Sequence, residues 1–299
     1  MHVADRLHAA IEATGSVACV GLDPRPALLP EQLRADALDR HGNTETAVAA
    51  AFVAFNTAII DAVAGHCAAV KPQVACYEAY GAAGWSALAE TVAHARANGI
   101  EVIVDAKRND IGSTAEHYRQ AVFGGAPLLG TGSARGLGGD WVTVNGYLGA
   151  DSIEPFLDPD APHGVFVLVR TSNPSAVDLQ SESTFERMAA LVHGWGTSRR
   201  GRGGLSAVGA VVGATWPAEA RRLRQLMPNT PFLVPGYGAQ GGGALDALAG
   251  ARPEDGGAIL VNSSRAIIGA WQSAPEGVDF AEASRVALDA MNDALAAAR

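Results

Sequence analysis

The feature that most constrains the fold of this 299-residue chain is a series of eight short apolar segments separated by stretches of helical periodicity. Continuous apolar runs of this length are typical of parallel strands that are covered on both faces. The predicted strands span residues 17–22, 68–71, 101–106, 141–145, 164–170, 207–213, 231–235 and 258–262. Eight strand–helix units in this length predict an α/β fold of the (β/α)8 or TIM-barrel type.

The segments between the strands are rich in alanine and place apolar residues at helical spacing. The clearest predicted helices cover residues 46–64, 85–98, 185–195 and 217–227, and a last helix near 280–298 would close the outer ring. A doubly wound sheet is the alternative, but no Gly-x-Gly-x-x-Gly motif follows the first strand. We therefore expect a single barrel domain over residues 1–299, with loop insertions at 124–139 and 194–204.

Charge and cysteine usage exclude several classes of function. The net charge is −9, and the sequence contains no basic stripe that could neutralise the phosphates of a nucleic acid. We therefore expect no nucleic-acid partner. The N-terminus lacks a signal-type apolar core, and no uninterrupted apolar stretch reaches about 18 residues, so we expect no membrane association. Cys19, Cys67 and Cys76 lack metal-type spacing. Free thiols and a cytoplasmic location are the prediction.

A barrel predicts where chemistry occurs, because active sites of this fold lie at the carboxyl-terminal ends of the strands. Polar residues gather at those ends. In chain order they are Asp23, Lys71, Asp105 with Lys107, Asn145, Thr171–Asn173, Thr215, Gly236–Gln240 and Ser263–Arg265. We predict a catalytic mouth at this rim.

Lysine is scarce in this chain and occurs only at strand ends. Of 22 basic residues, only Lys71 and Lys107 are lysines. An ammonium group can donate a proton, whereas a guanidinium does not at neutral pH. Side chains two apart on a strand share a face, so Asp105 and Lys107 should both point into the mouth. The alternative for this pair is a structural ion pair.

Asp110 closes the cluster Asp105-Ala-Lys-Arg-Asn-Asp110, just before a predicted helix. Its alternative role is that of a helix cap, with Ser113 and Glu116 as a capping box.

Five ordered motifs resemble the orotidine 5′-phosphate decarboxylase family, in particular its longer bacterial form. Residues 104–114 look like its catalytic signature, Val-Asp-Ala-Lys-Arg-Asn-Asp-Ile-Gly-Ser-Thr. Val70–Gln73 resembles the segment with its other lysine, and Gly21–Pro24 resembles its first-strand aspartate segment. Pro235–Gly242 is similar to its phosphate loop, and Asn262–Arg265 is similar to its eighth-strand arginine site.

The resemblance implies a carboxy-lyase that converts orotidine monophosphate to UMP and CO2 in de novo pyrimidine biosynthesis, without a metal or organic cofactor. Lys107 would donate the proton to the carbanion at C6 of the pyrimidine. Asp105 would lie near the substrate carboxylate, and Lys71 and Asp110 would complete an alternating charge network. The other expected substrate-binding residues are Asp23 for the ribose, Gln240, Gly241, Ser264 and Arg265 for the phosphate, and Ser172 or Asn173 for the base.

The resemblance also implies a homodimer, because the family's second aspartate and a nearby threonine enter from the partner subunit. Asp110 and Thr114 would then complete the partner's site. One departure is Asn109, where the longer bacterial form has glycine. Asn tolerates the left-handed backbone that glycine supplies, so we expect the turn to be preserved.

Three other functions share parts of this pattern. Sugar-phosphate decarboxylases and aldol-type synthases of the same superfamily contain Asp-x-Lys-x-x-Asp but use Mg²⁺. A Schiff-base aldolase and a catalytically silent nucleotide-binding barrel are the remaining alternatives. The loop at residues 235–242 and the signature at 104–114 favour the nucleotide enzyme.

Overall fold

The computed structural model describes residues 1–158, 162–238, 241–253 and 255–299, and its strands form a closed parallel barrel in chain order. All eight predicted strands are confirmed, with ends within two residues of the prediction. The strands are β1 (Ala18–Leu22), β2 (Ala69–Pro72), β3 (Glu101–Arg108), β4 (Trp141–Val144), β5 (Gly164–Arg170), β6 (Val208–Val212), β7 (Phe232–Val234) and β8 (Ile259–Ser263).

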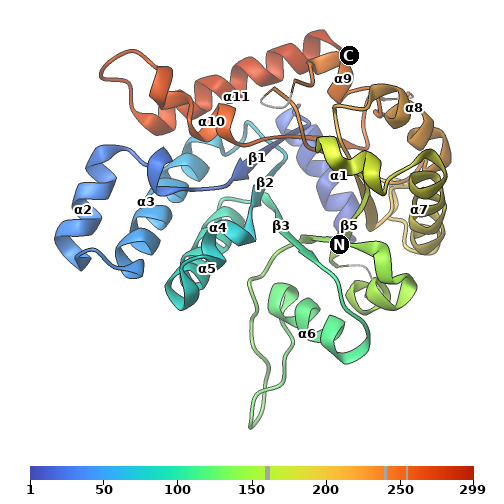
Figure 1. Cartoon of the computed structure of the whole chain (residues 1–299), viewed down its shortest axis with the longest axis horizontal. Helices are drawn as coiled ribbons and strands as arrows, with labels where there is room; N and C mark the ends of the chain where they lie inside the picture. The colour runs from blue at the N-terminus through green and yellow to red at the C-terminus, as the bar shows by residue number, and fades with distance from the viewer. Residues whose placement is uncertain (159–161, 239–240, 254) are drawn as a thin grey trace.

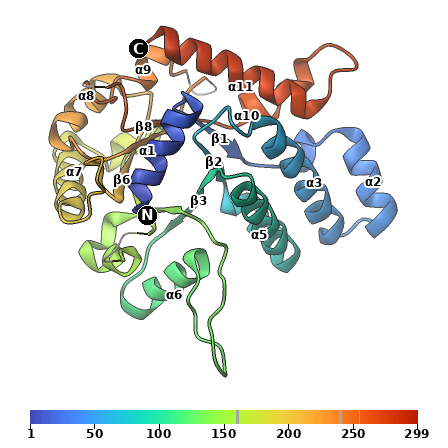
Figure 2. The same ribbon diagram turned by 180° about the vertical axis from the view of Figure 1, so that it is seen from behind.

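Helices surround the strands, as the opposite views in Figures 1 and 2 show. The longer ones are α1 (Val3–Thr14), α2 (Glu31–His41), α3 (Glu45–Val63), α5 (Gly81–Ala97), α6 (Gly112–Phe123), α7 (Glu182–Gly196), α8 (Pro217–Leu226) and α11 (Phe280–Ala297). The short helices are α4 (Val74–Glu78), α9 (Ala244–Ala247) and α10 (Arg265–Ile268). Six 3₁₀ segments complete the described part of the chain: η1 (Pro26–Leu28), η2 (Gly146–Leu148), η3 (Ala150–Ser152), η4 (Glu154–Phe156), η5 (Pro174–Asp178) and η6 (Ala270–Ser273).

The core has two layers because strand side chains alternate between the two faces of the barrel wall. The outer layer packs the strands against the helices, and the inner layer fills the barrel. Trp141 and Phe166 dominate the inner layer, where glycine is required opposite them: a Cβ at Gly164 or Gly209 would overlap these rings. The filled interior leaves room for a site only at the ends of the barrel.

Helix α1, which the sequence patterns did not predict, closes the amino-terminal end of the barrel. Its residues Val3, Ala4 and Leu7 are buried and belong to the inner layer. The spacing of Val3 and Leu7 puts both on one helix face. With this end closed, the carboxyl-terminal end is the one that remains open.

Among the described residues, α3 is the one helix long and apolar enough to cross a membrane by length and composition. Half of its apolar window is buried inside the protein, and the helix packs against α2, α5 and α11. Its apolar character is therefore accounted for by packing in the outer layer.

Residues 124–139 form a projecting hairpin, here called the arm, which extends beyond α6 at the bottom of Figure 1. Backbone hydrogen bonds join its two sides: Gly125 N donates to Ala134 O (2.9 Å) and Ala134 N donates to Ala126 O (2.7 Å). Leu128 and Leu129 are exposed at its tip. The prediction of a loop insertion here is confirmed, and the second predicted insertion, 194–204, begins within the end of α7.

Candidate active site

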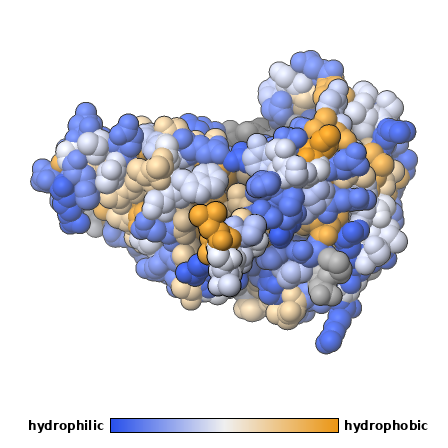
Figure 3. Space-filling model, turned by 90° about the horizontal axis from the view of Figure 1, so that it is seen from below, coloured by the Kyte–Doolittle hydropathy of each residue, from blue (hydrophilic) through white to orange (hydrophobic). Residues whose placement is uncertain are grey.

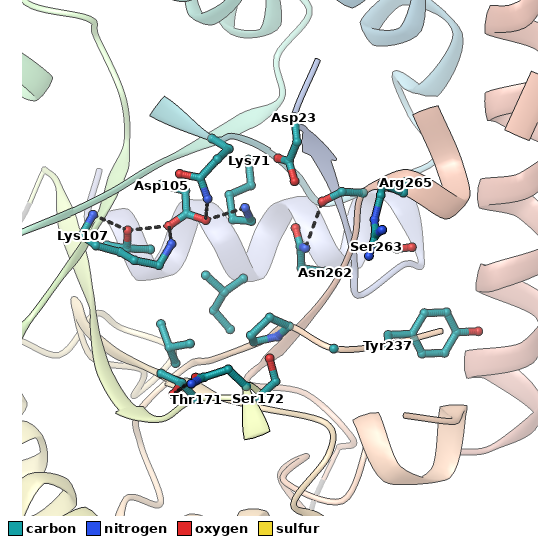
Figure 4. A pocket seen from close by; sticks show the side chains of 18 of the residues that line it. Asp23, Lys71, Asp105, Lys107, Thr171, Ser172, Tyr237, Asn262, Ser263 and Arg265 are labelled. Atoms are coloured by element: carbon teal, nitrogen blue, oxygen red, sulfur yellow. Dashed lines mark hydrogen bonds and ion pairs between the residues drawn. The ribbon is translucent and has the colours of Figure 1, made fainter. Parts of the chain in front are cut away.

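A cavity of about 640 Å³ opens at the carboxyl-terminal ends of the strands, within the usual size range of small-molecule sites. Every strand or the loop after it contributes to its wall. Leu168, Val211 and Leu233 are its apolar lining residues on β5, β6 and β7. Figure 4 shows Lys71, Asp105 and Lys107 toward one end of the cavity and Arg265 and Tyr237 toward the other. Thr171 and Ser172 lie on the opposite wall.

Asp105 on β3 joins the two lysines of the chain. Its Oδ2 accepts a hydrogen bond from Lys71 Nζ and its Oδ1 accepts one from Lys107 Nζ, both at 2.6 Å. The Lys71 side chain is 5% exposed, whereas that of Lys107 is 47% exposed. Lys71 is therefore part of the wall, and Lys107 presents its ammonium group to the cavity.

Electrostatics keeps the buried pair ionised. Burial alone would lower the pKa of Lys71, but the charges of Asp105 and Asp23 raise it above its ordinary value. Burial would likewise raise the pKa of Asp105, but Lys71 and Lys107 hold it far below its usual range. At neutral pH the cavity thus contains a fixed carboxylate beside a fixed ammonium group.

The contact between Asp105 and Lys107 depends on an irregularity in β3. Val104 pairs with Val142 and Arg108 pairs with Val144, so three residues of β3 lie opposite one residue of β4. A bulge of this kind redirects side chains. The strand alternation expected from the sequence is therefore not what brings the two side chains together.

The left-handed backbone expected at Asn109 occurs instead at Lys107, which has a φ of +48°. Asn109 is not among the residues with positive φ. The left-handed residue lies two positions earlier than Asn109, because the backbone changes direction within the β3 bulge.

The far end of the cavity is built by β8 and the loop after β7. Ser264 and Arg265 line it together with Gly236 and Tyr237. Gly21 on β1 is required beside this wall, since a Cβ there would overlap the Ser264 hydroxyl. Gly241 has a φ of +93° and is not one of the lining residues. Gln240 lies outside the described residues.

The segment Thr171–Asn173 lines the cavity after β5. Its first residue, Thr171, is fixed by hydrogen bonds to Gln180 and Trp216. Thr171 N donates to Gln180 Oε1 (2.8 Å), and Gln180 Nε2 donates to Thr171 Oγ1 (2.9 Å). Trp216 Nε1 donates to Thr171 O (3.0 Å). These bonds fix the backbone of the loop directly before Ser172 and Asn173, which both line the cavity.

Two residues predicted at the rim do not line the cavity. Asn145 caps η2 by accepting a hydrogen bond from Tyr147 N (3.0 Å). Thr215 donates to Ser172 O (3.3 Å) and so supports the wall from outside. Both side chains therefore bond to backbone groups outside the cavity: Asn145 to its own turn, and Thr215 to the loop after β5.

Asp110 and Thr114 also lie outside their own chain's cavity. Asp110 Oδ1 accepts a hydrogen bond from Ile111 N (2.8 Å), and Thr114 is exposed on α6. The alternative capping box of Ser113 and Glu116 is wrong. Helix α6 begins at Gly112, so Ser113 is already inside its first turn.

Several residues that line the cavity were assigned no role from the sequence, although Gln73 and Asn262 lie in the motifs quoted above. Gln73 Nε2 donates to Asp105 Oδ2 (3.0 Å), and Thr143 Oγ1 donates to Asp105 Oδ1 (2.8 Å). Gln73 was detectable, since it lies two residues after Lys71. Asn262 also lines the cavity, and its buried Oδ1 has no hydrogen-bond partner among the described residues. Arg25 completes this group.

Together, the closed barrel and its polar cavity define a (β/α)8-barrel enzyme whose cavity has the size of a small-molecule site and lies between a lysine–aspartate array and an arginine. Within the described residues, no group of three or more His, Cys, Asp or Glu side chains is arranged to hold a metal ion. Residues 17–277 match the family described as "Orotidine 5'-phosphate decarboxylase / HUMPS family". The chain belongs to this family.

Similar proteins carry the same description over nearly their full length. An orotidine 5′-phosphate decarboxylase of Rhodopirellula baltica is 44% identical over 307 residues, covering 99% of each chain. One from Haloarcula marismortui is 44% identical over 280 residues, covering 92% of this chain and 89% of that protein. The solved structure of Leishmania donovani OMP decarboxylase is 32% identical, with a TM-score of 0.75 and coverage of 100% and 98%.

Proposed function

We propose that this chain catalyses the decarboxylation of orotidine 5′-phosphate to UMP and CO2 in pyrimidine biosynthesis, with Lys107 as the proton donor. The activity is that of a carboxy-lyase and follows from the family and its curated relatives. The observation that carries the role of Lys107 is its half-exposed side chain in the cavity wall, whose ammonium group lies 2.6 Å from Asp105. Arginine would not replace it, because a guanidinium does not donate its proton at neutral pH.

The chemistry proceeds by loss of CO2, which leaves an electron pair on C6 of the pyrimidine. The Lys107 ammonium group stabilises this developing negative charge and then transfers a proton to it. An N–H bond breaks, a C–H bond forms, and Lys107 regains its proton from solvent. Asp105 would lie near the substrate carboxylate, where its charge disfavours the bound ground state.

The remaining groups hold the substrate. Lys71 counters the charge of Asp105 in the wall and, with Asp23, would hydrogen-bond the ribose hydroxyls. Gly241 and the side chains of Gln240, Ser264 and Arg265 would form the phosphate site, with the guanidinium group of Arg265 as the charged partner of the dianion. Contacts this far from the reacting carbon can still lower the barrier, since binding energy there positions the ring. Ser172 or Asn173 would contact the amide edge of the base.

We also propose a homodimer in which Asp110 and Thr114 complete the partner's site. Asp110 lies outside its own cavity, and the Ile111–Thr114 segment is exposed. The arm lies next in the chain after α6 and presents Leu128 and Leu129 to solvent. Figure 3 views the molecule from the side toward which the arm projects and shows hydrophobic side chains there among hydrophilic ones. A second copy would cover this surface.

We further propose that the chain is a single barrel domain and that the protein is located in the cytoplasm. The barrel pairs β1 with β8, so residues from both ends of the chain share one sheet. The three cysteines are free thiols, as is usual in a reducing compartment.

The test is to follow the ultraviolet change of orotidine 5′-phosphate with purified protein in the presence of EDTA. We expect full turnover with EDTA, a loss of at least about 100-fold in Lys107→Ala, and retained UMP binding in that variant. Arg108→Ala removes the neighbouring cation outside the cavity and serves as the control. Near-normal turnover by Lys107→Ala would disprove the proton-donor role, and loss of turnover with EDTA would favour the Mg²⁺-dependent alternative.

A further inference from the structure

Thr143 is the β4 residue that lies opposite the bulge in β3. Its neighbours Val142 and Val144 pair with Val104 and Arg108, which leaves Thr143 alone beside residues 105–107. The side chain of Thr143 is buried and lines the cavity wall. A polar side chain at such a position needs hydrogen-bond partners.

Its hydroxyl group makes two hydrogen bonds, both to the bulge. Lys107 N donates to Thr143 Oγ1 (3.0 Å), and Thr143 Oγ1 donates to Asp105 Oδ1 (2.8 Å). A hydroxyl has one hydrogen and two lone pairs, so both roles can be filled at once. Figure 4 labels Lys107 and Asp105, the two residues that these bonds join, and its dashed lines mark hydrogen bonds beside them.

The first of these bonds falls on a strained backbone. Lys107 has a φ of +48°, a left-handed conformation that side chains with a Cβ rarely adopt. Such conformations persist where surrounding contacts impose them. The hydrogen bond to Thr143 is the contact that satisfies the Lys107 N–H in this conformation.

The second bond orients the carboxylate. Asp105 Oδ2 is held by Lys71 and Gln73, while Oδ1 is held by Lys107 and Thr143. Without the hydroxyl, Oδ1 would depend on the half-exposed Lys107 alone. The carboxylate would then be held mainly through Oδ2, and the position of Oδ1 would be less well fixed.

We infer that Thr143 is a positioning residue: it fixes the backbone of Lys107 and the carboxylate of Asp105, and thereby the place of the Lys107 ammonium group. The inference rests on the proposed role of Lys107 as proton donor. Thr143 itself takes no part in proton transfer.

The test compares Thr143→Val, which keeps the shape and removes the hydroxyl, with Thr143→Ser, which keeps the hydroxyl. We expect kcat of Thr143→Val to fall about 100-fold, since a small displacement of a reacting group costs this much. KM and UMP affinity should stay within about threefold, because the wall keeps its shape. Thr143→Ser should retain most of the activity. A crystal structure of Thr143→Val should show Lys107 away from its left-handed φ.

Thr91→Val is the matched control, since it removes a buried threonine hydroxyl that accepts from Asn56 Nδ2 (3.1 Å) and does not line the cavity. It should leave kcat unchanged. If Thr143→Val does not fold, Thr143→Ala and Thr143→Ser are compared in its place, with the same expected contrast.

Equal kcat in the wild type and Thr143→Val, or equal losses in the Val and Ser variants, would overturn the positioning role. Lys107→Ala separates the two proposals. If that variant is inactive while Thr143→Val is normal, only the role of Thr143 fails; if Lys107→Ala is active, the proposed function fails first.

Discussion

At the scale of single residues, the site depends on what surrounds each lysine. Lys71 and Lys107 share one carboxylate, yet one is buried in the wall and the other faces the cavity. Burial and paired charge suit Lys71 to a fixed electrostatic role, and partial exposure suits Lys107 to meet substrate. Breaking a buried pair is costly because it leaves one charge without its partner.

Asp105→Asn should therefore lower the free energy of unfolding by about 3 kcal/mol at neutral pH, because buried Lys71 loses its nearest counter-charge. The pKa of Asp105 is depressed in the folded state, so its contribution is present above the ordinary value of 3.8 and is lost as pH falls below it. Urea unfolding should show the two proteins converging at acid pH. Asp39→Asn, an exposed carboxylate on α2, is the control, and a constant difference at all pH values would contradict the prediction.

Glu101, at the amino-terminal end of β3, should give the opposite pH dependence. Burial, with the charge of Asp140, raises its pKa from 4.5 to about 7. Between these values the folded protein keeps a proton that the unfolded chain has lost, so stability should fall as pH rises through this window. Glu101→Gln should reduce that slope in urea unfolding. Parallel slopes for the two proteins would show that Glu101 is already ionised.

At the scale of elements, two departures from a regular barrel matter most: the bulge in β3 and the projecting arm at residues 124–139. The bulge in β3 allows Asp105 and Lys107 to meet, and it is matched by Thr143 on β4. The arm is a hairpin-shaped loop with an apolar tip, joined across by a few backbone hydrogen bonds, and isolated hairpins are marginally stable in water. Packing against a second copy would supply the missing burial.

Leu129→Asp should weaken that dimer without unfolding the chain, because Leu129 is fully exposed in the single chain. Light scattering over a dilution series should show dissociation at a concentration at least about tenfold higher than for the wild type, since a charge at an apolar contact is poorly tolerated. Melting of the single chain should be unchanged.

Val286→Asp, at an exposed apolar position on α11, is the control for this experiment. An unchanged dimer in Leu129→Asp would remove the arm from the proposed interface.

At the scale of the whole molecule, the two ends of the barrel have different tasks. The amino-terminal end is closed by α1 and packed with inner-layer side chains, while the carboxyl-terminal end carries the cavity. In barrels of this type, stability and activity divide in this way.

Leu7→Ala should therefore lower the free energy of unfolding by about 2–5 kcal/mol, the cost of removing a fully buried leucine side chain. KM and kcat should stay near those of the wild type at a temperature where the variant is folded, because the cavity lies at the other end. Denaturant unfolding and steady-state kinetics on the same preparation check both parts. Leu38→Ala, at an exposed position on α2, is the control, and a large loss of kcat in folded Leu7→Ala would contradict this division.

The sequence by itself determined the barrel, the order of its strands and the rim that carries the polar residues. Apolar runs and strand ends are local patterns, and a parallel barrel places all such ends together. It therefore predicted the positions of Asp23, Lys71, Asp105, Lys107 and Arg265 around one opening.

Only the tertiary structure decided the register between β3 and β4, the left-handed backbone at Lys107, and the hydrogen bonds of Thr143 to Lys107 and Asp105. It also placed α1 beneath the barrel and Asp110 outside its own chain's cavity. These features depend on contacts between segments far apart in the chain. A local pattern does not encode which residues meet across two strands, because a shift of a single residue in register changes every such pair.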